Sequence, residues 1–292
     1  MQNRDDLIGL ICRLAAVPSF TTYEDRIHPL VREIAAMQPL AEMQRIPENN
    51  LLIRMPGRPE LRPVALAAHL DKINHFCADR EEPVYIGRDA DRLTGVLDDS
   101  MGVGICLSLL LKAAPESWPP LYLLLSECEE GTGLREHPHL LRDGGEGWHH
   151  GIGAERLSQY LRAQDAAPAL TITVDVTPKF QGKLGLAIYT NHWELNEVEP
   201  SEELVRRTEE VCEAFVKIEP RLTRHNNSND YLVYGCEFNV DPARPSVSVA
   251  LEAAVHPNHR ADEQVHIGDI LDLASMIERF LADASELSWL KI

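Results

Sequence analysis

The sequence predicts a three-layer α/β/α sandwich around a mostly parallel, twisted sheet. Short apolar runs alternate with longer segments of helical period along the whole chain, which is the pattern of α/β proteins. The runs are too short for helices and largely apolar, as expected for strands covered on both faces. Several of them end abruptly in carboxylate or imidazole side chains, and α/β enzymes keep their chemistry at the carboxyl edge of the sheet.

Six segments have the apolar spacing of helices. The first ends before Pro18, because proline is incompatible with a helix interior. The third begins with Asp98 and Asp99, and acidic side chains are favourable at the positive N-terminal end of a helix. The expected helices span residues 6–16, 23–37, 98–112, 154–163, 202–218 and 267–284.

Six other segments have the length and composition of buried strands. Pro56 and Gly57 close the first of them. Two further short edge strands are expected at residues 85–87 and 93–95, around a polar turn. The six main strands are expected at residues 51–55, 64–68, 121–125, 170–174, 186–190 and 247–251.

The composition excludes some classes of partner. The 292 residues include 28 Lys and Arg against 46 Asp and Glu, which gives a formal charge of -18. Nucleic acids and anionic membranes require clustered positive charge, so we expect neither as a partner. The six cysteines are scattered, the N-terminus lacks a signal-peptide pattern, and no apolar run reaches the ~20 residues of a spanning helix. The sequence therefore predicts a soluble, cytoplasmic protein.

Acidic and imidazole residues follow four of the expected strands. They are His69 and Asp71, Glu129 and Glu130, Asp175, and the pair His256 and His259, while Asp98 opens a helix in between. Because the carboxyl ends of parallel strands meet at one edge of a sheet, we expect these side chains to converge. Two divalent ions held close together need nitrogen and carboxylate ligands, one bridging group and a carboxylate base. The candidate ligands are His69, Asp98 as the bridge, Glu130, Asp175 and one late histidine, with Glu129 as the general base.

Each of these residues has a simpler explanation when taken alone. His69 could be a core histidine, Asp98 and Asp99 could only cap a helix, and Asp175 could be a turn residue. The acidic run could be a solvated turn, in which Glu127 is a third carboxylate that could replace one of the predicted pair. All of these explanations would have to hold at once, so a joint metal site is the more economical hypothesis.

The motifs around these residues resemble those of the co-catalytic zinc peptidases, which include the M28, M20 and M42 families. In those enzymes H-x-D supplies the first ligand, D-[DN]-x-x-G the bridging aspartate, and E-E the base and a further ligand. A strand-end aspartate and a late histidine complete their site. The matching segments here are AHLD at 68–71, LDDSMG at 97–102, CEEG at 128–131, VDVT at 174–177 and HRADE at 259–263. The resemblance runs over nearly the whole chain, although Thr132 stands where the family has glycine.

The resemblance implies a role for each residue. His69, Asp98, Glu130, Asp175 and His259 would hold two divalent metal ions, with His256 as the alternative to His259. Zinc is the expected metal, and cobalt or manganese accept a similar ligand set. Glu129 would act as general base, and Asp71 would orient His69 through its other ring nitrogen.

Two loops are candidates for selecting the substrate. Asn229-Asp230-Tyr231 resembles the S-D-[HY] loop of M28 enzymes, so Asp230 and Tyr231 are candidate substrate-binding residues, although an ordinary turn would have the same composition. The Gly-rich stretch over residues 137–153 contains four histidines and is either a surface loop or a further metal or substrate site. These histidines are His137, His139, His149 and His150.

The spacing of the motifs predicts the domain organisation. Many members of these families carry an inserted lid or dimerisation domain between the first histidine and the bridging aspartate, or between the last aspartate and the last histidine. Here the first interval is 29 residues, less than the ~50 of a small domain, and the second is 84 residues, which the remaining helix and strands nearly use up. We therefore expect residues 1–292 to form one catalytic domain without a lid. The oligomeric state of relatives that assemble through the insert therefore does not predict whether this chain forms a homo-oligomer.

The resemblance implies an enzyme, namely a two-metal exopeptidase. An aminopeptidase that removes the N-terminal residue of small peptides is the first hypothesis, because a site rich in carboxylates suits a free α-amine. A deacylase or amidohydrolase of N-acyl amino acids on the same metal core is the alternative. A non-catalytic, metal-binding relative is the third hypothesis, and the presence of Glu129 beside a full ligand set argues against it.

Overall fold

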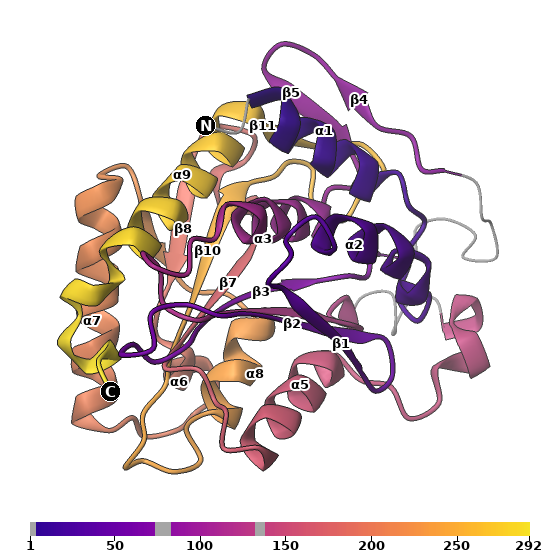
Figure 1. Ribbon diagram of the computed structural model, residues 1–292. Helices are drawn as coiled ribbons and strands as arrows, with labels where there is room; N and C mark the ends of the chain where they lie inside the picture. Colours follow the sequence, from indigo (N-terminus) through magenta and orange to yellow (C-terminus); the bar gives the residue numbers. More distant parts are fainter. Residues whose placement is uncertain (1–3, 74–82, 132–137) are drawn as a thin grey trace.

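The computed structural model describes residues 4–73, 83–131 and 138–292, and its centre is an eight-stranded sheet. The strands are β1 (Glu42–Ile46), β2 (Asn50–Met55), β3 (Val64–His69), β6 (Leu121–Ser126), β7 (Leu170–Thr177), β8 (Leu186–Tyr189), β9 (Thr223–His225) and β10 (Val247–Ala254). Their order across the sheet is β1-β2-β6-β3-β7-β10-β8-β9. Helices cover both faces of this sheet (Figure 1), so the predicted α/β/α sandwich is confirmed.

The four central strands, β6, β3, β7 and β10, run parallel to one another. Val64 of β3 lies opposite both Leu121 of β6 and Leu170 of β7, so these strands begin level and end at the same edge. The outer strands β2 and β8 run antiparallel to their inner neighbours. Antiparallel pairing is therefore confined to the outer strands, and the predicted site residues lie at the parallel centre of the sheet.

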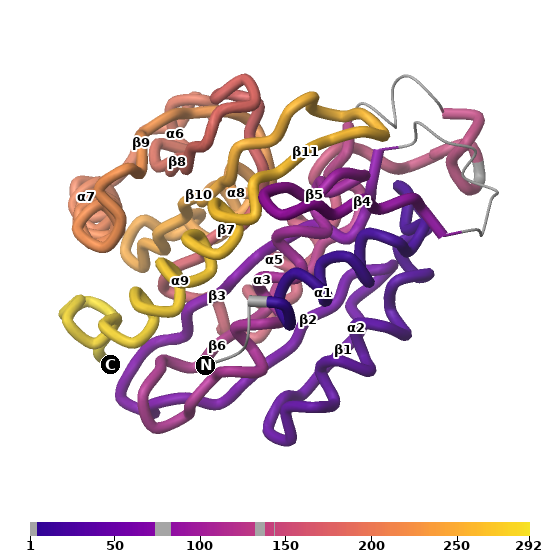
Figure 2. The backbone as a smooth tube through the Cα atoms, turned by 90° about the horizontal axis from the view of Figure 1, so that it is seen from above, coloured from indigo at the N-terminus to yellow at the C-terminus, as the bar shows by residue number. Residues whose placement is uncertain are grey.

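The helices are distributed unequally between the two faces. One face is covered by α1 (Arg4–Ala15), α2 (His28–Ala35), α3 (Ser100–Lys112), α7 (Glu202–Ile218) and α9 (Ile267–Asp283), and the larger apolar core lies beneath them. The other face is covered by α5 (Ile152–Ala163), α6 (His192–Leu195) and α8 (Asp230–Glu237). Figure 2 shows the chain from above, with α1 and α2 on the near side of the strands.

Helix α3 is buried along most of its length and positions the start of the predicted metal site. Two glycines allow its close packing: a Cβ atom at Gly104 would lie 2.4 Å from Ile11 of α1, and one at Gly102 would lie 2.3 Å from the backbone oxygen of Val174. The carboxylate of Asp99 caps the helix by accepting a hydrogen bond from the backbone N–H of Gly102 at 2.9 Å. Asp98 is thereby held directly beside the end of β7.

A second, three-stranded sheet lies beside the first. It is formed by β4 (Gly87–Arg88), β5 (Arg92–Gly95) and β11 (Glu263–His266), in the order β11-β5-β4. The predicted strand 93–95 lies within β5, whereas the one predicted at 85–87 shares only Gly87 with β4; β5 pairs with β11 on one side and with β4 on the other. The carboxylate of Glu263 accepts hydrogen bonds from the backbone N–H groups of Leu97 and Asp98 at 2.8 and 3.1 Å. The small sheet thus helps to fix the backbone of Asp98.

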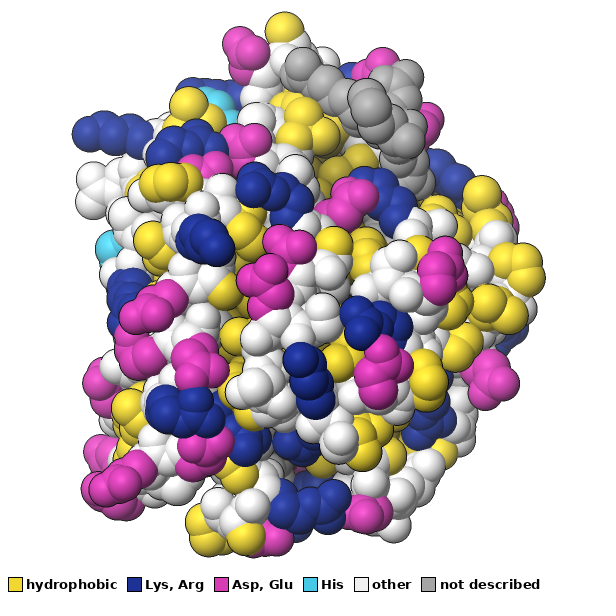
Figure 3. Space-filling view, turned by 60° about the vertical axis from the view of Figure 1, so that its left-hand side comes forward, with side chains coloured by type: hydrophobic (Ala, Val, Ile, Leu, Met, Phe, Trp, Pro, Cys, Tyr) yellow, Lys and Arg dark blue, Asp and Glu magenta, His cyan; other side chains and the backbone are white. Residues whose placement is uncertain are grey.

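The surface agrees with the composition. On the face shown in Figure 3, Lys and Arg side chains are interspersed with Asp and Glu side chains. Within the described residues, no helix combines the length and the apolar character needed to cross a bilayer. The described cysteines, Cys12, Cys106, Cys128, Cys212 and Cys236, are free thiols, while Cys77 lies outside the described residues.

Candidate metal centre

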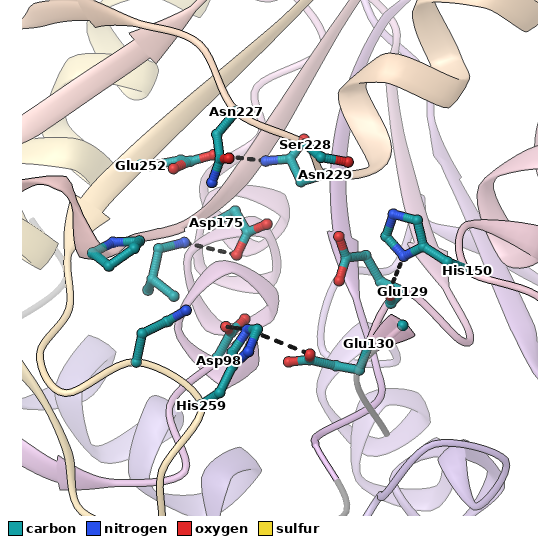
Figure 4. Close-up of a pocket in the computed structure, with 14 residues that line it drawn as sticks. Asp98, Glu129, Glu130, His150, Asp175, Asn227, Ser228, Asn229, Glu252 and His259 are labelled. Carbon is teal, nitrogen blue, oxygen red and sulfur yellow. Dashed lines mark hydrogen bonds and ion pairs between the residues drawn. The ribbon is translucent and has the colours of Figure 1, made fainter. Parts of the chain in front are cut away.

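Five of the predicted site residues, Asp98, Glu129, Glu130, Asp175 and His259, converge around one cavity at the carboxyl edge of the central strands (Figure 4). His69 is the last residue of β3, Asp175 lies near the end of β7, and Asp98 directly precedes the capping residue of α3. Glu129 and Glu130 follow β6. A cavity of about 270 Å³ opens at this edge, and its walls include Asp98, Glu129, Glu130, Asp175 and His259.

The two histidines of the site face opposite oxygens of one carboxylate. Nε2 of His69 lies 3.0 Å from Oδ1 of Asp98 and 3.9 Å from Oδ1 of Asp175. Nε2 of His259 lies 3.6 Å from Oδ2 of Asp98 and 3.5 Å from Oε2 of Glu130. Two groups of one histidine and two carboxylates therefore share Asp98, which is the arrangement that a bridging ligand requires.

The donor atoms of this cluster fit a divalent metal ion. The imidazole nitrogens and carboxylate oxygens are the ligand types that zinc accepts. Atoms of His69, Asp98 and Glu130, and likewise of His69, Asp99 and Asp175, lie within 4.8 Å of one another in buried surroundings. Oε1 of Glu130 is buried and has no hydrogen-bond partner among the described residues. Because a buried carboxylate oxygen without a partner is costly, this atom fits a ligand to a cation.

Asp71 holds three parts of the site together. Nδ1 of His69 donates a hydrogen bond to the backbone oxygen of Asp71 at 3.0 Å, and Oδ1 of Asp71 lies 3.3 Å from the same nitrogen, as expected for the residue that orients this ring. The same carboxylate accepts hydrogen bonds from the backbone N–H groups of Glu129 and Glu130 at 3.0 and 3.1 Å, and from the hydroxyl of Thr21 at 2.9 Å. Burial raises the pKa of Asp71, but the hydrogen bond and charge of His69, together with the backbone N–H groups of Glu129 and Glu130, bring it below the ordinary value. Asp71 therefore positions a histidine and both glutamates.

Asp71→Asn is expected to weaken metal binding and turnover while leaving the fold intact. The amide would present an N–H group to a backbone N–H of Glu129 or Glu130, so one of the two glutamates must move. We expect a 10- to 100-fold loss in zinc affinity or kcat/KM, a range typical of groups that support metal ligands. Zinc titration and kinetics against Thr21→Val, which removes only one donor to the same carboxylate, measure the effect. Values for Asp71→Asn within twofold of the wild type would contradict this role.

Glu129, the residue predicted to be the general base, faces the cavity. Its side chain lines the cavity and is 9% exposed. Burial, together with the nearby carboxylates of Asp175 and Asp230, raises the pKa of Glu129 well above its ordinary value, and His69 partly offsets this shift. The ring of His150 donates a hydrogen bond from Nδ1 to the backbone oxygen of Glu129, which adds a second support for the same turn.

Glu127 does not compete for these roles. Its carboxylate is fully buried and accepts hydrogen bonds from the backbone N–H of Asn49 at 2.7 Å and the side-chain amide of Asn50 at 2.6 Å. The guanidinium of Arg156 lies 2.7 Å from it. Glu127 therefore fastens the β1–β2 turn to the end of β6, and the neighbouring pair Glu129 and Glu130 faces the cavity.

The two late histidines are separated by the structure. His259 faces Asp98 and Glu130, and its side chain is 36% exposed. The backbone of His256 pairs with Gln264, and its ring lies against Gly182. The structure thus brings His259 to the carboxylates and leaves His256 outside them.

In the loop expected to select the substrate, the residues that line the cavity precede the two predicted ones, Asp230 and Tyr231. Tyr231 is completely buried, and Asp230 lies beneath the cavity, where its carboxylate accepts a hydrogen bond from Ser126. Neither side chain lines the cavity, because both belong to the first turn of α8, which packs against the sheet. The three preceding residues, Asn227, Ser228 and Asn229, form that part of the wall instead.

The Gly-rich stretch contributes one histidine to the cavity. His150 lines the wall, whereas His149 forms an ion pair with Glu155 at 3.0 Å on the exposed surface. His139 lies in a short 3-10 helix, Pro138–Leu140, and His137 lies outside the described residues, as does Thr132. No group of three potential ligands forms around these histidines within the described residues.

Sequence reasoning did not identify Glu252. This residue lies within β10, is 2% exposed and lines the cavity. Burial and the carboxylate of Asp175 raise its pKa well above the ordinary value. The signal was a single acidic residue inside an otherwise apolar strand, since an ionisable side chain is rarely buried without a partner.

The metal-free protein is expected to lose stability as the pH rises from 5 to 7. Burial and the charge of Asp98 raise the pKa of Asp175 to about 8 and also raise that of Glu130. The folded state therefore holds protons that the unfolded chain has released, so unfolding becomes easier as the pH rises. Each such proton is worth about 1.4 kcal/mol per pH unit, or roughly 2–4 °C in Tm.

Bound zinc should reduce this loss, because the metal replaces the protons on the same carboxylates, whereas Glu24 and Glu263, whose pKa burial raises to about 8, contribute equally in both samples. The test compares Tm between pH 5 and 7 in EDTA and in excess zinc. His192, whose pKa burial lowers to about 4, acts in the opposite direction but equally in both samples. Equal slopes of Tm against pH with and without zinc would show that these carboxylates do not bind the metal.

Comparison with known proteins identifies the fold. No model of a protein family matches the sequence, and no curated protein sequence matches it either. An aminopeptidase from the archaeon Desulfurococcus kamchatkensis is similar in structure, with a TM-score of 0.70 and 13% identity over 99% of this chain and 98% of that one. The TET1 peptidase of Pyrococcus horikoshii has a TM-score of 0.64 and 15% identity over 94% and 99% of the two chains. A tripeptidase from Staphylococcus aureus has a TM-score of 0.65 and 13% identity over 97% and 99%. The chain therefore has the fold of these peptidases.

Proposed function

We propose that this chain is a two-metal aminopeptidase that removes the N-terminal residue from short peptides. One observation carries the proposal: His69 and His259 face opposite oxygens of Asp98 in a cavity that Glu129 also lines. The fold shared with aminopeptidases and a tripeptidase supports the same conclusion. The chemistry of this site follows from its own side chains.

Two ions would be held by the two groups that share Asp98. His69 and Asp175 would complete one group, and His259 and Glu130 the other. We propose zinc, with cobalt or manganese as substitutes that accept similar ligands. When bound, the ions supply Lewis acidity, which polarises the scissile carbonyl and lowers the pKa of the attacking water.

Glu129 would move the proton that hydrolysis requires. It would accept a proton from the attacking water and deliver it to the nitrogen of the leaving amine. Asp71 would keep Glu129 and Glu130 at fixed positions through their backbone N–H groups. Because all of these groups are buried, little rearrangement of solvent would accompany the transfer.

The shape and charge of the cavity support a small substrate with a free amine. A cavity of about 270 Å³ holds little more than one residue beside the metal-binding groups. Its wall is mainly polar and carries five carboxylates, so a cationic α-ammonium is a better match than an acyl group. These carboxylates belong to Asp98, Glu129, Glu130, Asp175 and Glu252.

We propose that residues 1–292 act as a single catalytic domain in the cytoplasm, where free cysteines are the rule. The Pyrococcus horikoshii TET1 peptidase can assemble into a tetrahedron or a large octahedral shell. We extend the proposal to a homo-oligomer of this chain, which light scattering on the purified protein would test.

The test of the proposed function is mass spectrometric. Metal-stripped protein, reconstituted with zinc, is incubated with a pool of short peptides and with the same pool acetylated at the N-terminus. We expect loss of single N-terminal residues from the free pool only, and only when metal is present. Release of acetate from the blocked pool would identify a deacylase instead, and an absence of turnover in both pools at full metal loading would reject the proposal.

A further inference from the structure

We propose that Glu252, held by Asn229, binds the α-ammonium group of the substrate. This inference rests on the proposed function. It assigns recognition of the substrate amine to a residue that is neither one of the proposed metal ligands nor the proposed general base. Glu252 lies in the cavity wall opposite Glu129 (Figure 4), and three features of its surroundings support this role.

The first feature is its position. Glu252 of β10 lies directly opposite Asp175 of β7 in a parallel pair. Neighbouring strands are about 4.8 Å apart, and residues in register point to the same face of a sheet. The carboxylate of Glu252 is therefore one strand away from a candidate metal ligand. Neither of the two groups that share Asp98 includes it.

The second feature is that Glu252 is rigidly held by neutral groups. The side-chain amide of Asn229 donates a hydrogen bond to Oε1 of Glu252 at 2.7 Å. Asn229 is itself fixed, because its Oδ1 accepts a hydrogen bond from the backbone N–H of Tyr231 at 2.9 Å and caps α8. The hydroxyls of Tyr189 and Thr177 lie beside the same carboxylate.

The third feature is the lack of a counter-charge. Among the described residues, no Lys, Arg or His side chain forms an ion pair with Glu252, although this residue is 2% exposed. A buried carboxylate surrounded only by neutral donors is costly unless a cation reaches it. The open side of Glu252 faces the cavity, so the cation that fits is one that arrives with the substrate.

The reach of the site favours the α-ammonium over a basic side chain. In a peptide only one carbon separates the α-nitrogen from the scissile carbonyl, so its partner must stand within a few ångströms of the metal-binding groups. Glu252 meets this condition because it neighbours Asp175. The amine of a lysine side chain would lie roughly 6 Å further from the scissile carbonyl, beyond the immediate neighbourhood of Asp175 where Glu252 stands.

This assignment predicts discrimination against blocked N-termini. An acylated nitrogen is neutral and would leave the buried carboxylate without its cation, in the way that unpaired buried polar groups reject substrate analogues. Glu252 would then be the residue that selects free peptides over N-acyl amino acids.

The test uses Glu252→Gln, which keeps the shape of the side chain and its hydrogen bond with Asn229. Hydrolysis of leucine p-nitroanilide is compared with that of its des-amino analogue, 4-methylpentanoyl p-nitroanilide. In the wild type the amino substrate should be preferred, and in the variant this preference in kcat/KM should fall on the order of 10²-fold, with the des-amino rate little changed. Glu155→Gln, at an exposed glutamate outside the cavity, is the matched control.

A binding measurement keeps this test independent of turnover. Calorimetry with leucine hydroxamate and 4-methylpentanohydroxamate on zinc-loaded protein reports the same preference without hydrolysis, so it remains informative even if the proposed function fails. Loss of the preference for the amine in Glu252→Gln supports the assignment. Equal weakening of both ligands, or an unchanged preference, would overturn it.

Discussion

Replacing Glu129 with glutamine is expected to lower kcat on the order of 10²–10⁴-fold while metal content stays the same. The amide has nearly the same shape as the carboxylate, but it cannot accept the proton of the attacking water. The backbone N–H of residue 129 still donates to Asp71, so Glu130 keeps its position. Peptide hydrolysis and metal analysis on the same preparation check both halves of this expectation.

Glu127 offers the matching contrast two residues earlier. Glu127→Gln should retain kcat for the folded fraction, since this side chain faces the β1–β2 turn and not the cavity. It should lower the free energy of unfolding by about 1–3 kcal/mol, because Arg156 loses its ionic partner and the amide nitrogen meets other donors. If Glu127→Gln abolished turnover and Glu129→Gln did not, the general base would be assigned to the wrong glutamate.

The strand ends were predictable because they combine two independent patterns. A buried parallel strand is recognised by its apolar run. Polar residues interrupt or closely follow such runs at His69, at Asp175 and at the pair Glu129 and Glu130 after β6. Convergence then follows from topology, since parallel strands end at one edge of the sheet. The order of the motifs along the chain was therefore sufficient to bring the candidate ligands together.

The elements that escaped prediction carry weaker local signals. Strand β1 is largely exposed and lacks an apolar run, and it forms because it pairs with β2. Strand β11 depends in the same way on pairing with β5, some 170 residues earlier in the chain. Periodicity reports burial against a local face, so it cannot show a strand whose stability comes from a distant partner.

The wall of the cavity was less predictable than its metal-binding edge. The loop before α8 was identified, but Asp230 and Tyr231 turn inward because Asn229 caps the helix and places them in its first turn. Which residues of a loop face a cavity depends on where the next helix begins, and a boundary error of one or two residues reverses the answer. Glu252 was missed for a related reason, since an acidic residue inside a strand has no motif to mark it.

Asp98→Asn should reduce the zinc content from about two ions per chain to one or none, and peptide hydrolysis should fall at least ~10³-fold with it. Asp98 is the shared member of both histidine groups: its Oδ1 lies 3.0 Å from His69 and its Oδ2 3.6 Å from His259. An amide nitrogen cannot replace a carboxylate oxygen as a ligand, so at least one group loses a donor and both lose the bridging charge. Elemental analysis after dialysis against zinc, and the rise in Tm on zinc addition, measure the loss.

The neighbouring Asp99→Asn variant decides between two ligand sets. Asp99 caps α3, and burial raises its pKa well above the ordinary value, so the neutral amide resembles the form that the folded protein already favours. This variant should therefore fold normally and keep both ions. In the wild type, however, the carboxylate of Asp99 lies close enough to His69 and Asp175 to form a second possible ligand group with them. If Asp99→Asn lost metal while Asp98→Asn retained it, Asp99 would be the ligand in place of Asp98. The shared carboxylate on which a two-metal mechanism depends would then be lost from the proposal.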